Sequence, residues 1–316
     1  MKKLGVAVIG AGFWGRNHAR NFKEINETEL LAVCDIDPER AKAVAEQFHV
    51  DAYTDSRKLF RRRDIEAVTI CTWSTKLALE TLKALKAGKH VLVEKPMART
   101  AGKAKKIVEL AQRKERILMV GFLMRFIPGV QRIKEAVNKR EIGSIVCATA
   151  KRVSQWPVRI GDVGVIKDLA IHDIDIMRTL FAEDPIAVYA KAGALKHKFE
   201  DYAQIMLTFN EGKTAFIEAN WLTPYKIRKL VVTGSEAIMT VDYLTQEVTI
   251  ETAGQTLTPR YEWAEPLKLE LQHFSNCVLR NKQPIITGKD GLKALQLAEA
   301  ALKSAKKCTR IKLKEK

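Results

Sequence analysis

The chain has 316 residues, of which 47% are hydrophobic and 29% charged, a composition typical of a soluble globular protein with room for two domains. Its longest apolar runs are too short, or too interrupted by charge, to cross a bilayer. The net charge of +17 does not indicate nucleic-acid binding. Most lysines and arginines are interleaved with acids on helix-like stretches, which favours solvated surface or attraction of an anionic small molecule.

The N-terminal stretch combines two lysines with an apolar run that resembles a signal peptide. Because glycines interrupt that run, it is better interpreted as a strand than as a signal peptide, which favours a cytoplasmic location. The five cysteines, at 34, 71, 147, 277 and 308, are widely spaced and no pair has C-x-x-C spacing. They indicate reduced thiols rather than a zinc knuckle or a redox motif.

Up to about residue 123, short aliphatic segments alternate with longer amphipathic ones. Strands are predicted at 4–12, 30–36, 67–72, 90–95 and 117–122, and helices at 15–25, 37–48, 76–88 and 100–115. Asp37 is a suitable N-cap for the second helix, with Pro38 in its first turn. The strands are continuously apolar, which is typical of a parallel sheet covered on both faces. Residues 1–123 are therefore predicted to form an α/β domain with a doubly wound parallel sheet.

Beyond residue 124 the pattern changes to short segments joined by tight turns. Strands are predicted at 145–153, 187–196, 202–210, 214–222, 229–235, 237–243 and 247–253, and helices at 128–139, 171–181, 267–279 and 291–307. Such strands are typical of an antiparallel sheet with one face against solvent or a partner. Residues 124–316 are predicted to form an α+β domain with a large, mostly antiparallel sheet that binds substrate and carries a homodimer or homotetramer interface.

A glycine-rich turn joins the first predicted strand to the first predicted helix. It contains Gly10, Gly12, Phe13, Trp14 and Gly15. In a G-x-G-x-x-G pattern the first glycine permits a tight turn, the second lets the backbone approach a pyrophosphate, and the third allows close helix–strand packing. The helix N-terminus then offers N–H groups and positive charge to the phosphates. The turn predicts a dinucleotide site in a Rossmann sheet, with a turn that binds no ligand as the alternative.

An acid ends the second predicted strand. Asp35 lies 20 residues beyond Gly15, where a carboxylate accepts hydrogen bonds from the ribose hydroxyls of a dinucleotide. Its charge would repel the 2′-phosphate of NADP, which favours NAD. Arg40 is close in sequence and would soften that preference.

Two further predicted strands end in polar residues. Thr72, Trp73 and Ser74 stand at the end of one, and Glu94 and Lys95 at the end of the next. Ligands of a doubly wound sheet bind outside the carboxyl ends of its strands, so we expect these side chains to face the cofactor. A lysine beside a carboxylate can donate to a substrate oxygen and relay a proton. The alternative is an ordinary surface ion pair, which contributes little.

Asp168 and His172 stand four residues apart, so on a helical turn they share one face. A carboxylate beside an imidazole orients the ring and keeps its pKa in a range useful for proton transfer. The alternatives are a packed or capping histidine, or half of a metal site. Because no third ligand stands at a useful spacing, no metal is predicted.

Six segments together resemble the glucose–fructose oxidoreductase and inositol dehydrogenase family over essentially the whole length. They are GAGFWG, CDIDPERA, KALKAGKHVLVEKPMA, GFLMRFIPGVQ, DLAIHDID and ITGKDGLKALQLAEAALKSA. The resemblance implies an NAD-dependent sugar dehydrogenase in which Lys95, Asp168 and His172 form a catalytic triad at the carbon that loses hydride. It also implies that the Lys95–Pro96 bond is often cis.

Within that family the chain most resembles UDP-N-acetylglucosamine 3-dehydrogenases and related nucleotide-sugar enzymes. The segment KRVSQWPVRIGD supplies Arg152 and Arg159 for a diphosphate, and Trp156 for stacking on a uracil or a sugar. A loop packed at a subunit interface is the alternative. Arg125, in the segment GFLMRF, is also expected at the substrate.

Two segments depart from the family's pattern. The usual T-P-x-x-x-H is T-W-S-T-K-L at 72–77, and the usual G-x-N-x-R-F is G-F-L-M-R-F at 121–126. Both border the cofactor or the substrate, so contacts there are expected to differ.

The expected function is oxidation of a secondary hydroxyl of a sugar, in particular a nucleotide sugar, with hydride transfer to NAD. Either His172 or Lys95 is the base, and Asp168 orients them. A free cyclitol or monosaccharide is the alternative substrate, and a non-catalytic NAD-dependent sensor is the alternative class of protein. Neither nucleic acid nor a membrane is expected as a partner.

Overall fold

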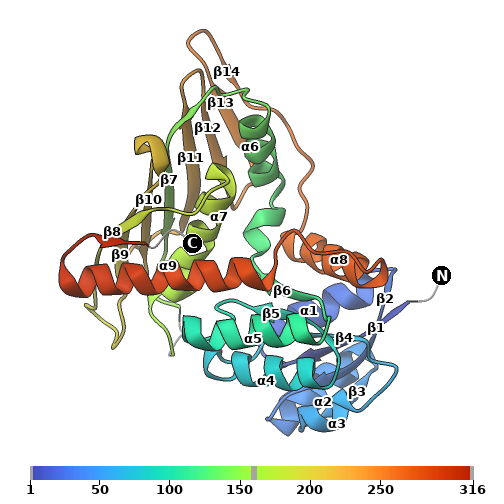
Figure 1. Cartoon of the computed structure of the whole chain (residues 1–316). Coiled ribbons are helices and arrows are strands. Elements are labelled where there is room, and N and C mark those ends of the chain that lie inside the picture. The colour runs from blue at the N-terminus through green and yellow to red at the C-terminus, as the bar shows by residue number, and fades with distance from the viewer. Residues whose placement is uncertain (1–2, 158–161, 314–316) are drawn as a thin grey trace. The chain divides into compact units, whose positions relative to one another are not determined.

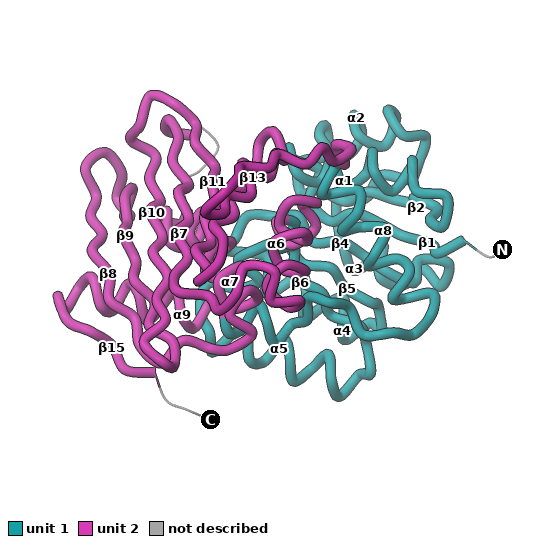
Figure 2. Tube along the Cα trace, turned by 90° about the horizontal axis from the view of Figure 1, so that it is seen from above, with its two compact units in different colours: residues 1–123, 265–293 teal, residues 124–264, 294–316 magenta. Residues whose placement is uncertain are grey.

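The computed structural model describes residues 3–157 and 162–313 (Figure 1). The chain divides into two compact units, residues 1–123 with 265–293 and residues 124–264 with 294–316 (Figure 2). The segment 265–293 was predicted to belong to the second domain, whereas the structure groups it with the first unit. The first unit is therefore assembled from two separate stretches of chain.

The described residues of the first unit form a six-stranded parallel sheet in the order β3-β2-β1-β4-β5-β6. Its strands are β1 (Leu4–Ile9), β2 (Thr28–Cys34), β3 (Asp51–Tyr53), β4 (Ala67–Ile70), β5 (His90–Glu94) and β6 (Leu118–Gly121). Its helices are α1 (Phe13–Glu24), α2 (Pro38–Phe48), α3 (Ser56–Phe60), α4 (Ser74–Lys86), α5 (Ala101–Arg113) and α8 (Pro266–Leu279). The predicted doubly wound sheet is confirmed. Its winding changes direction between β1 and β4, where such sheets bind ligands.

The local sequence explains most of these elements. The strands β1, β4 and β6 are buried at every position, as their continuous apolar runs require when helices cover both faces. Asp37 caps α2 as predicted, since its Oδ1 accepts hydrogen bonds from the N–H groups of Glu39 and Arg40 at 3.1 and 3.2 Å. The elements β3 and α3 were not predicted, because three and five residues are too few for periodicity to reveal.

The described residues of the second unit form a nine-stranded sheet in the order β14-β13-β12-β11-β7-β10-β9-β8-β15. Its strands are β7 (Ile145–Val153), β8 (Ala187–Gly193), β9 (Tyr202–Thr208), β10 (Thr214–Asn220), β11 (Ile227–Gly234), β12 (Ile238–Asp242), β13 (Val248–Glu251), β14 (Thr256–Leu257) and β15 (Ile311–Lys312). The pair β7 and β10 is parallel and the other pairs are antiparallel, so the predicted mostly antiparallel sheet is confirmed.

Helices α6 (Pro128–Asn138) and α7 (Ile171–Phe181) belong to the second unit, and α9 (Gly288–Lys307) begins in the first unit and ends in the second. Shorter helical turns are η1 (Leu123–Phe126), η2 (Ile166–Ala170) and η3 (Asn210–Gly212). Within residues 3–157 and 162–313, none of the helices combines the length and apolar character needed to span a bilayer.

One face of the nine-stranded sheet is open. Side chains alternate along β10, where Ile217 is buried and Phe216 is 45% exposed. Phe216 lies in register with Met206 of β9 and Thr149 of β7, and Thr149 is in register with Val231 of β11. A largely apolar row therefore crosses the open face of the second unit.

Candidate active site

The glycine-rich turn leaves open space where a pyrophosphate is expected. Gly10 has a φ of +97°, and a Cβ there would lie 2.7 Å from the carbonyl carbon of Cys71. A Cβ on Gly15 would lie 1.6 Å from the carbonyl oxygen of Gly10, so the packing of the protein itself requires both glycines. A Cβ on Gly12 would meet no atom of the described residues within 4 Å. Gly12 is not needed for packing, which fits a role in admitting a ligand.

Helix α1 begins beside this space with its N-terminus available. It starts at Phe13, and neither a capping side chain nor an acidic residue occupies its first turn. The first N–H groups and the positive end of the helix dipole can therefore interact with an anion. The pyrophosphate of a dinucleotide is such an anion, so the residues present fit this cofactor.

Asp35 is held rigidly at the end of β2. Its Oδ2 accepts a hydrogen bond from the N–H of Ala11 at 2.7 Å, and its Oδ1 accepts one from the N–H of Asp37 at 3.0 Å. Arg40 lies 3.6 Å from Asp35 and 3.3 Å from Asp37. The guanidinium of Arg40 is thus shared between two carboxylates.

Large apolar side chains are exposed along the same edge of the sheet. Phe13 is 70% exposed and Trp73 is 59% exposed, and both were predicted site residues. Ile36, directly after Asp35, is 89% exposed and was missed. The signal that could have identified Ile36 is its position. It is an apolar residue directly after the acid that ends a strand, where its side chain does not face the core. Ile36 offers an apolar surface for a base beside the carboxylate that suits a ribose.

The segment after β4 accounts for one departure from the family's pattern. Trp73 is the N-cap of α4, and Ser74 is the first residue of that helix and is buried. Thr72 is half-buried. Leu77, which replaces the usual histidine, is buried in the core of the unit. The side chain at position 77 therefore stabilises the fold and offers no polar contact to a ligand.

The end of β5 brings together more polar groups than the sequence indicated. Glu94 is buried, and its Oε1 lies 3.1 Å from Nε2 of His18 on α1. The backbone N–H of Lys95 donates to Oε2 of Glu94 at 3.2 Å. Lys95 itself is half-buried, and the Lys95–Pro96 peptide bond is cis, as the family resemblance implied. His18 was not predicted, because an isolated histidine in an amphipathic helix gives no indication of its partner.

Asp168 and His172 lie at a change of helix type in the second unit. Asp168 is in η2, which is a π-helix, and η2 continues directly into α7, which contains His172. Both side chains are buried. The four-residue spacing predicted a regular helical turn, whereas the structure has the wider π turn. Such turns occur frequently at functional sites.

Glu200 holds the beginning of this π turn. Its carbonyl oxygen accepts from the N–H of Val165 at 2.8 Å, and its Oε1 accepts from the N–H of Ile166 at 3.3 Å. A Cβ on Gly164 would lie 2.1 Å from the Glu200 carboxyl carbon, so the glycine permits this approach. Burial raises the pKa of Glu200 above its ordinary value. The position of Asp168 thus depends on a carboxyl group that no motif revealed.

Two arginines predicted at the substrate are buried beside α7. The Nε and Nη2 atoms of Arg152 donate to Asp173 at 2.6 and 2.8 Å, and its guanidinium lies 5.0 Å from the centre of the Tyr243 ring. Arg125 donates from Nε to Asp175 at 2.6 Å. Bidentate pairing of this kind orients both partners. Arg152 and Arg125 therefore hold α7 within the second unit, a position that does not suit the diphosphate contact expected of Arg152.

The aromatic residue predicted for stacking is packed against other rings. The ring of Trp156 lies 4.7 Å from that of His197 and 5.4 Å from that of Trp221, between centroids. Trp156 is half-buried. Arg159 lies outside the described residues. Trp156 is thus part of an aromatic cluster within the second unit.

The predicted catalytic residues are distributed over both units. Lys95 belongs to the first unit, whereas Asp168 and His172 belong to the second. Asp168 and His172 lie in consecutive helical segments, η2 and α7, and Lys95 adjoins Glu94, whose carboxylate contacts His18.

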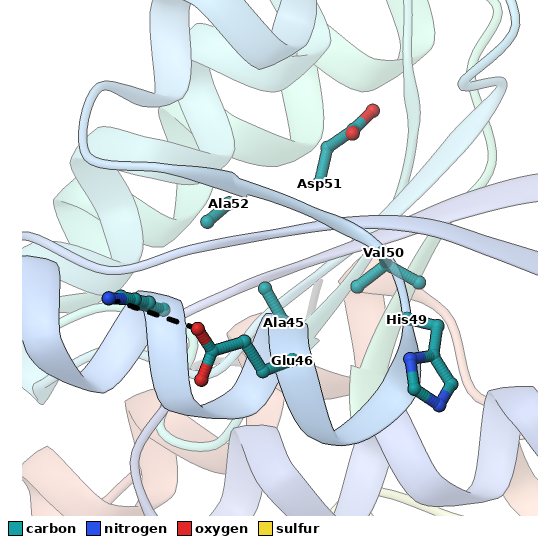
Figure 3. A pocket seen from close by; sticks show the side chains of 7 residues that line it. Ala45, Glu46, His49, Val50, Asp51 and Ala52 are labelled. Atoms are coloured by element: carbon teal, nitrogen blue, oxygen red, sulfur yellow. Dashed lines mark ion pairs between the residues drawn. The ribbon is translucent and has the colours of Figure 1, made fainter.

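A surface pocket of the first unit contains none of these residues. It lies between the end of α2 and β3 (Figure 3). Its lining residues are Lys42, Ala45, Glu46, His49, Val50, Asp51 and Ala52. The pocket lies away from the carboxyl ends of the central strands, so it does not change the site described above.

A doubly wound dinucleotide-binding unit and a mostly antiparallel α+β unit define the class of two-unit, NAD-binding oxidoreductases. Two family models match the chain. The model for the oxidoreductase family with an NAD-binding Rossmann fold matches residues 4–122, and the model for the GFO/IDH/MocA C-terminal domain matches residues 130–240. The chain belongs to the GFO/IDH/MocA oxidoreductase family, as its resemblance predicted.

Known members of the family are similar over nearly their whole length. Inositol 2-dehydrogenase of Rhizobium meliloti is 30% identical, over 94% of this chain and 95% of that protein. Myo-inositol 2-dehydrogenase of Thermotoga maritima is 28% identical, over 99% of each. The structure of UDP-N-acetylglucosamine 3-dehydrogenase from Acidithiobacillus ferrooxidans has a TM-score of 0.90 at 26% identity, over 97% of this chain and 99% of that chain. These relatives include enzymes named for a cyclitol and for a nucleotide sugar.

Proposed function

We propose that the protein is an NAD-dependent dehydrogenase that oxidises a secondary hydroxyl of a cyclitol or sugar to a ketone. The observation that carries this proposal is the position of Lys95 at the end of β5, in the sheet whose glycine-rich turn fits a dinucleotide. The buried Asp168 and His172 supply a second group able to move a proton. Full-length similarity to inositol dehydrogenases supports the same reaction type.

The first unit holds the cofactor. The space at Gly12 and the N-terminus of α1 receive the pyrophosphate, and Asp35 accepts from the ribose hydroxyls. Because Asp35 is an anchored anion and Arg40 is already shared between two acids, NAD is favoured over NADP. When bound, NAD accepts the hydride that leaves the substrate carbon.

The protein's own groups handle the proton. Lys95 or His172 removes the hydroxyl proton, and the other donates a hydrogen bond to the same oxygen. Asp168 orients these groups through its charge. The π turn and the ion pairs of α7 hold Asp168 and His172 in fixed positions, which reduces the cost of ordering them at each turnover.

A free cyclitol or monosaccharide is the substrate class that the contacts favour. Arg152 is buried in an ion pair with Asp173 and offers no open surface to a diphosphate, and Trp156 is half-buried and packs against His197, which leaves its ring only partly open to a uracil. A nucleotide sugar is the second candidate, favoured by the similarity to the Acidithiobacillus enzyme. Unchanged activity in Arg159→Ala would support the free substrate, and loss of activity on a UDP-sugar alone would support the second candidate.

The test is NADH formation with a panel of cyclitols, monosaccharides and UDP-sugars, with the product carbonyl located. Lys95→Met and His172→Gln are each expected to lower kcat by a factor of about 10² to 10⁴ and to retain NAD binding. Lys103→Met, at an exposed lysine of α5, is the matched control and should behave as the wild type. NAD binding without turnover on any substrate would support a sensor instead, and normal turnover in both site variants would refute the assignment.

A second copy of the chain is proposed to cover the open face of the nine-stranded sheet. The row of Met206, Phe216, Thr149 and Val231 gives that face a partly apolar surface in register across neighbouring strands. An exposed apolar surface of this kind is typical of a protein–protein contact. We therefore propose a homodimer or a homotetramer.

A further inference from the structure

A buried polar cluster lies behind Glu94 in the first unit. It consists of His18 on α1, Glu94 on β5 and Glu270 on α8, and all three side chains are buried. Helices α1 and α8 pack against each other, and the chain returns to the first unit to supply Glu270. The established contact in the cluster is that between Nε2 of His18 and Oε1 of Glu94, at 3.1 Å. The motif residue Glu94 is therefore backed by two groups that no motif contains.

The cluster is incompletely satisfied by hydrogen bonds. Neither carboxyl oxygen of Glu270 has a hydrogen-bond partner among the described residues, and neither does Nδ1 of His18. Buried polar groups without partners cost free energy, so proteins retain them chiefly where water enters or where they have a function. A cluster with these open positions can change its number of bound protons without breaking an existing contact.

The charge state of Glu270 follows from its surroundings. Burial, followed by the negative charge of Glu94, raises the pKa of Glu270 well above its ordinary value. This shift favours the neutral, protonated form of the Glu270 carboxyl group. Burial and the charge of Glu94 likewise raise the pKa of the Cys71 thiol at the end of β4. The imidazole of His18 lies beside the carboxylate of Glu94, with its Nδ1 unpaired among the described residues, and Lys95 is the neighbouring cation.

The redox state of a nicotinamide changes the charge that such a cluster faces. The ring is positive in NAD⁺ and neutral in NADH, and Glu94 stands at the strand end expected to face it. A carboxylate stabilises the positive ring, and a protonated imidazole beside that carboxylate opposes this effect. Loss of the positive charge on reduction therefore makes protonation of the cluster more favourable.

We propose that His18 and Glu270 act as positioning residues behind Glu94, and that the cluster takes up a proton from solvent when the bound cofactor is NADH rather than NAD⁺. This inference rests on the proposed function, because it requires the nicotinamide site. Glu270 adds no second negative charge, and His18 receives the proton at its buried ring. The cluster thereby couples cofactor preference to pH, and NADH affinity relative to NAD⁺ falls as pH rises.

Calorimetric titration with NAD⁺ and with NADH, in buffers of different ionisation enthalpy, counts the protons taken up on binding. We expect a larger uptake with NADH, and a ratio of the two affinities that changes by up to about tenfold per pH unit. His18→Gln keeps a donor near Glu94 but cannot be protonated, so the difference should be lost. The difference should persist in Lys95→Met, and in His273→Gln, which changes a half-buried histidine on α8.

Equal proton uptake with both cofactors, or a difference that survives His18→Gln, would overturn the inference. A difference lost in Lys95→Met would assign the proton to the lysine and would also overturn it. Binding of neither cofactor would remove the proposed function, an outcome distinct from binding with equal proton counts. Should His18→Gln not fold, Glu270→Gln provides the check. It should remove the infrared carbonyl band of a protonated carboxylic acid, and an unchanged spectrum would contradict the neutral Glu270 on which the cluster depends.

Discussion

Gly12→Ala separates what the fold needs from what the cofactor needs. The added methyl group would meet no atom of the described residues within 4 Å, and the backbone at Gly12 (φ −71°, ψ −163°) suits any residue. We therefore expect the stability to fall by about 1 kcal/mol or less, the cost of alanine at an N-cap. If the pyrophosphate occupies the space, the Kd for NAD should rise by roughly 10- to 100-fold, or about 1.4–2.8 kcal/mol.

The assay is calorimetric titration with NAD, together with the midpoint of urea unfolding. Gly102→Ala is the matched control, because a Cβ there also meets no described atom and lies on α5, away from the glycine-rich turn. Gly15→Ala provides the opposite case. Its Cβ would lie 1.6 Å from the carbonyl oxygen of Gly10, so it should destabilise the first unit by about 2 kcal/mol or more. Wild-type NAD affinity in Gly12→Ala would refute the assignment of this space to the pyrophosphate.

Three further predictions concern stability and assembly. Asp173→Asn leaves the buried guanidinium of Arg152 without its anion and should lower the free energy of unfolding in urea by about 3–5 kcal/mol. If the losses of Asp173→Asn and Arg152→Met simply add in the double variant, the pairing is contradicted. The contribution of Glu270 to the free energy of unfolding should fall as pH rises above about 4.5, by up to about 1.4 kcal/mol per pH unit, because folded Glu270 keeps a proton that the unfolded chain releases. In Glu270→Gln the free energy of unfolding should lack this part of its pH dependence. A pH profile identical to that of the wild type would contradict the protonated Glu270. Phe216→Glu places a charge on the open face of the nine-stranded sheet and should lower the mass of the oligomer measured by light scattering. An unchanged mass would contradict an interface on that face.

Local patterns in the sequence predicted the parts of the site that depend on neighbouring residues. The glycine-rich turn, Asp35 and the Asp37 cap each follow from a spacing of a few residues, and the structure places them as expected. The cis bond before Pro96 followed from the family resemblance. The Asp37 cap depends on the backbone of its own short segment, whereas Asp35 accepts from the distant Ala11 and Gly10 lies against Cys71. Those two were predictable because the spacing of the dinucleotide motif implies the distant contacts.

Contacts between distant segments could not be predicted in this way. The apolar spacing of α8 shows that the helix is buried, but it does not identify the unit that buries it. Arg152 reads as a free basic residue until its partner Asp173 is known. Glu270 reads as a surface acid of an amphipathic helix, because its burial depends on α1, about 250 residues earlier in the chain.

The return of the chain to the first unit has a consequence for its synthesis. The sheet strands of that unit are complete at residue 123, but α8, which packs on α1, belongs to the segment 265–293. A ribosome adds roughly 5–20 residues per second, so the 170 residues from 123 to 293 take about 10 to 30 s. During that interval the nascent first unit exposes the face of α1 that α8 later covers. That face of α1 would therefore stay available to a chaperone that binds nascent chains for the whole interval, although α1 is among the first elements to be made.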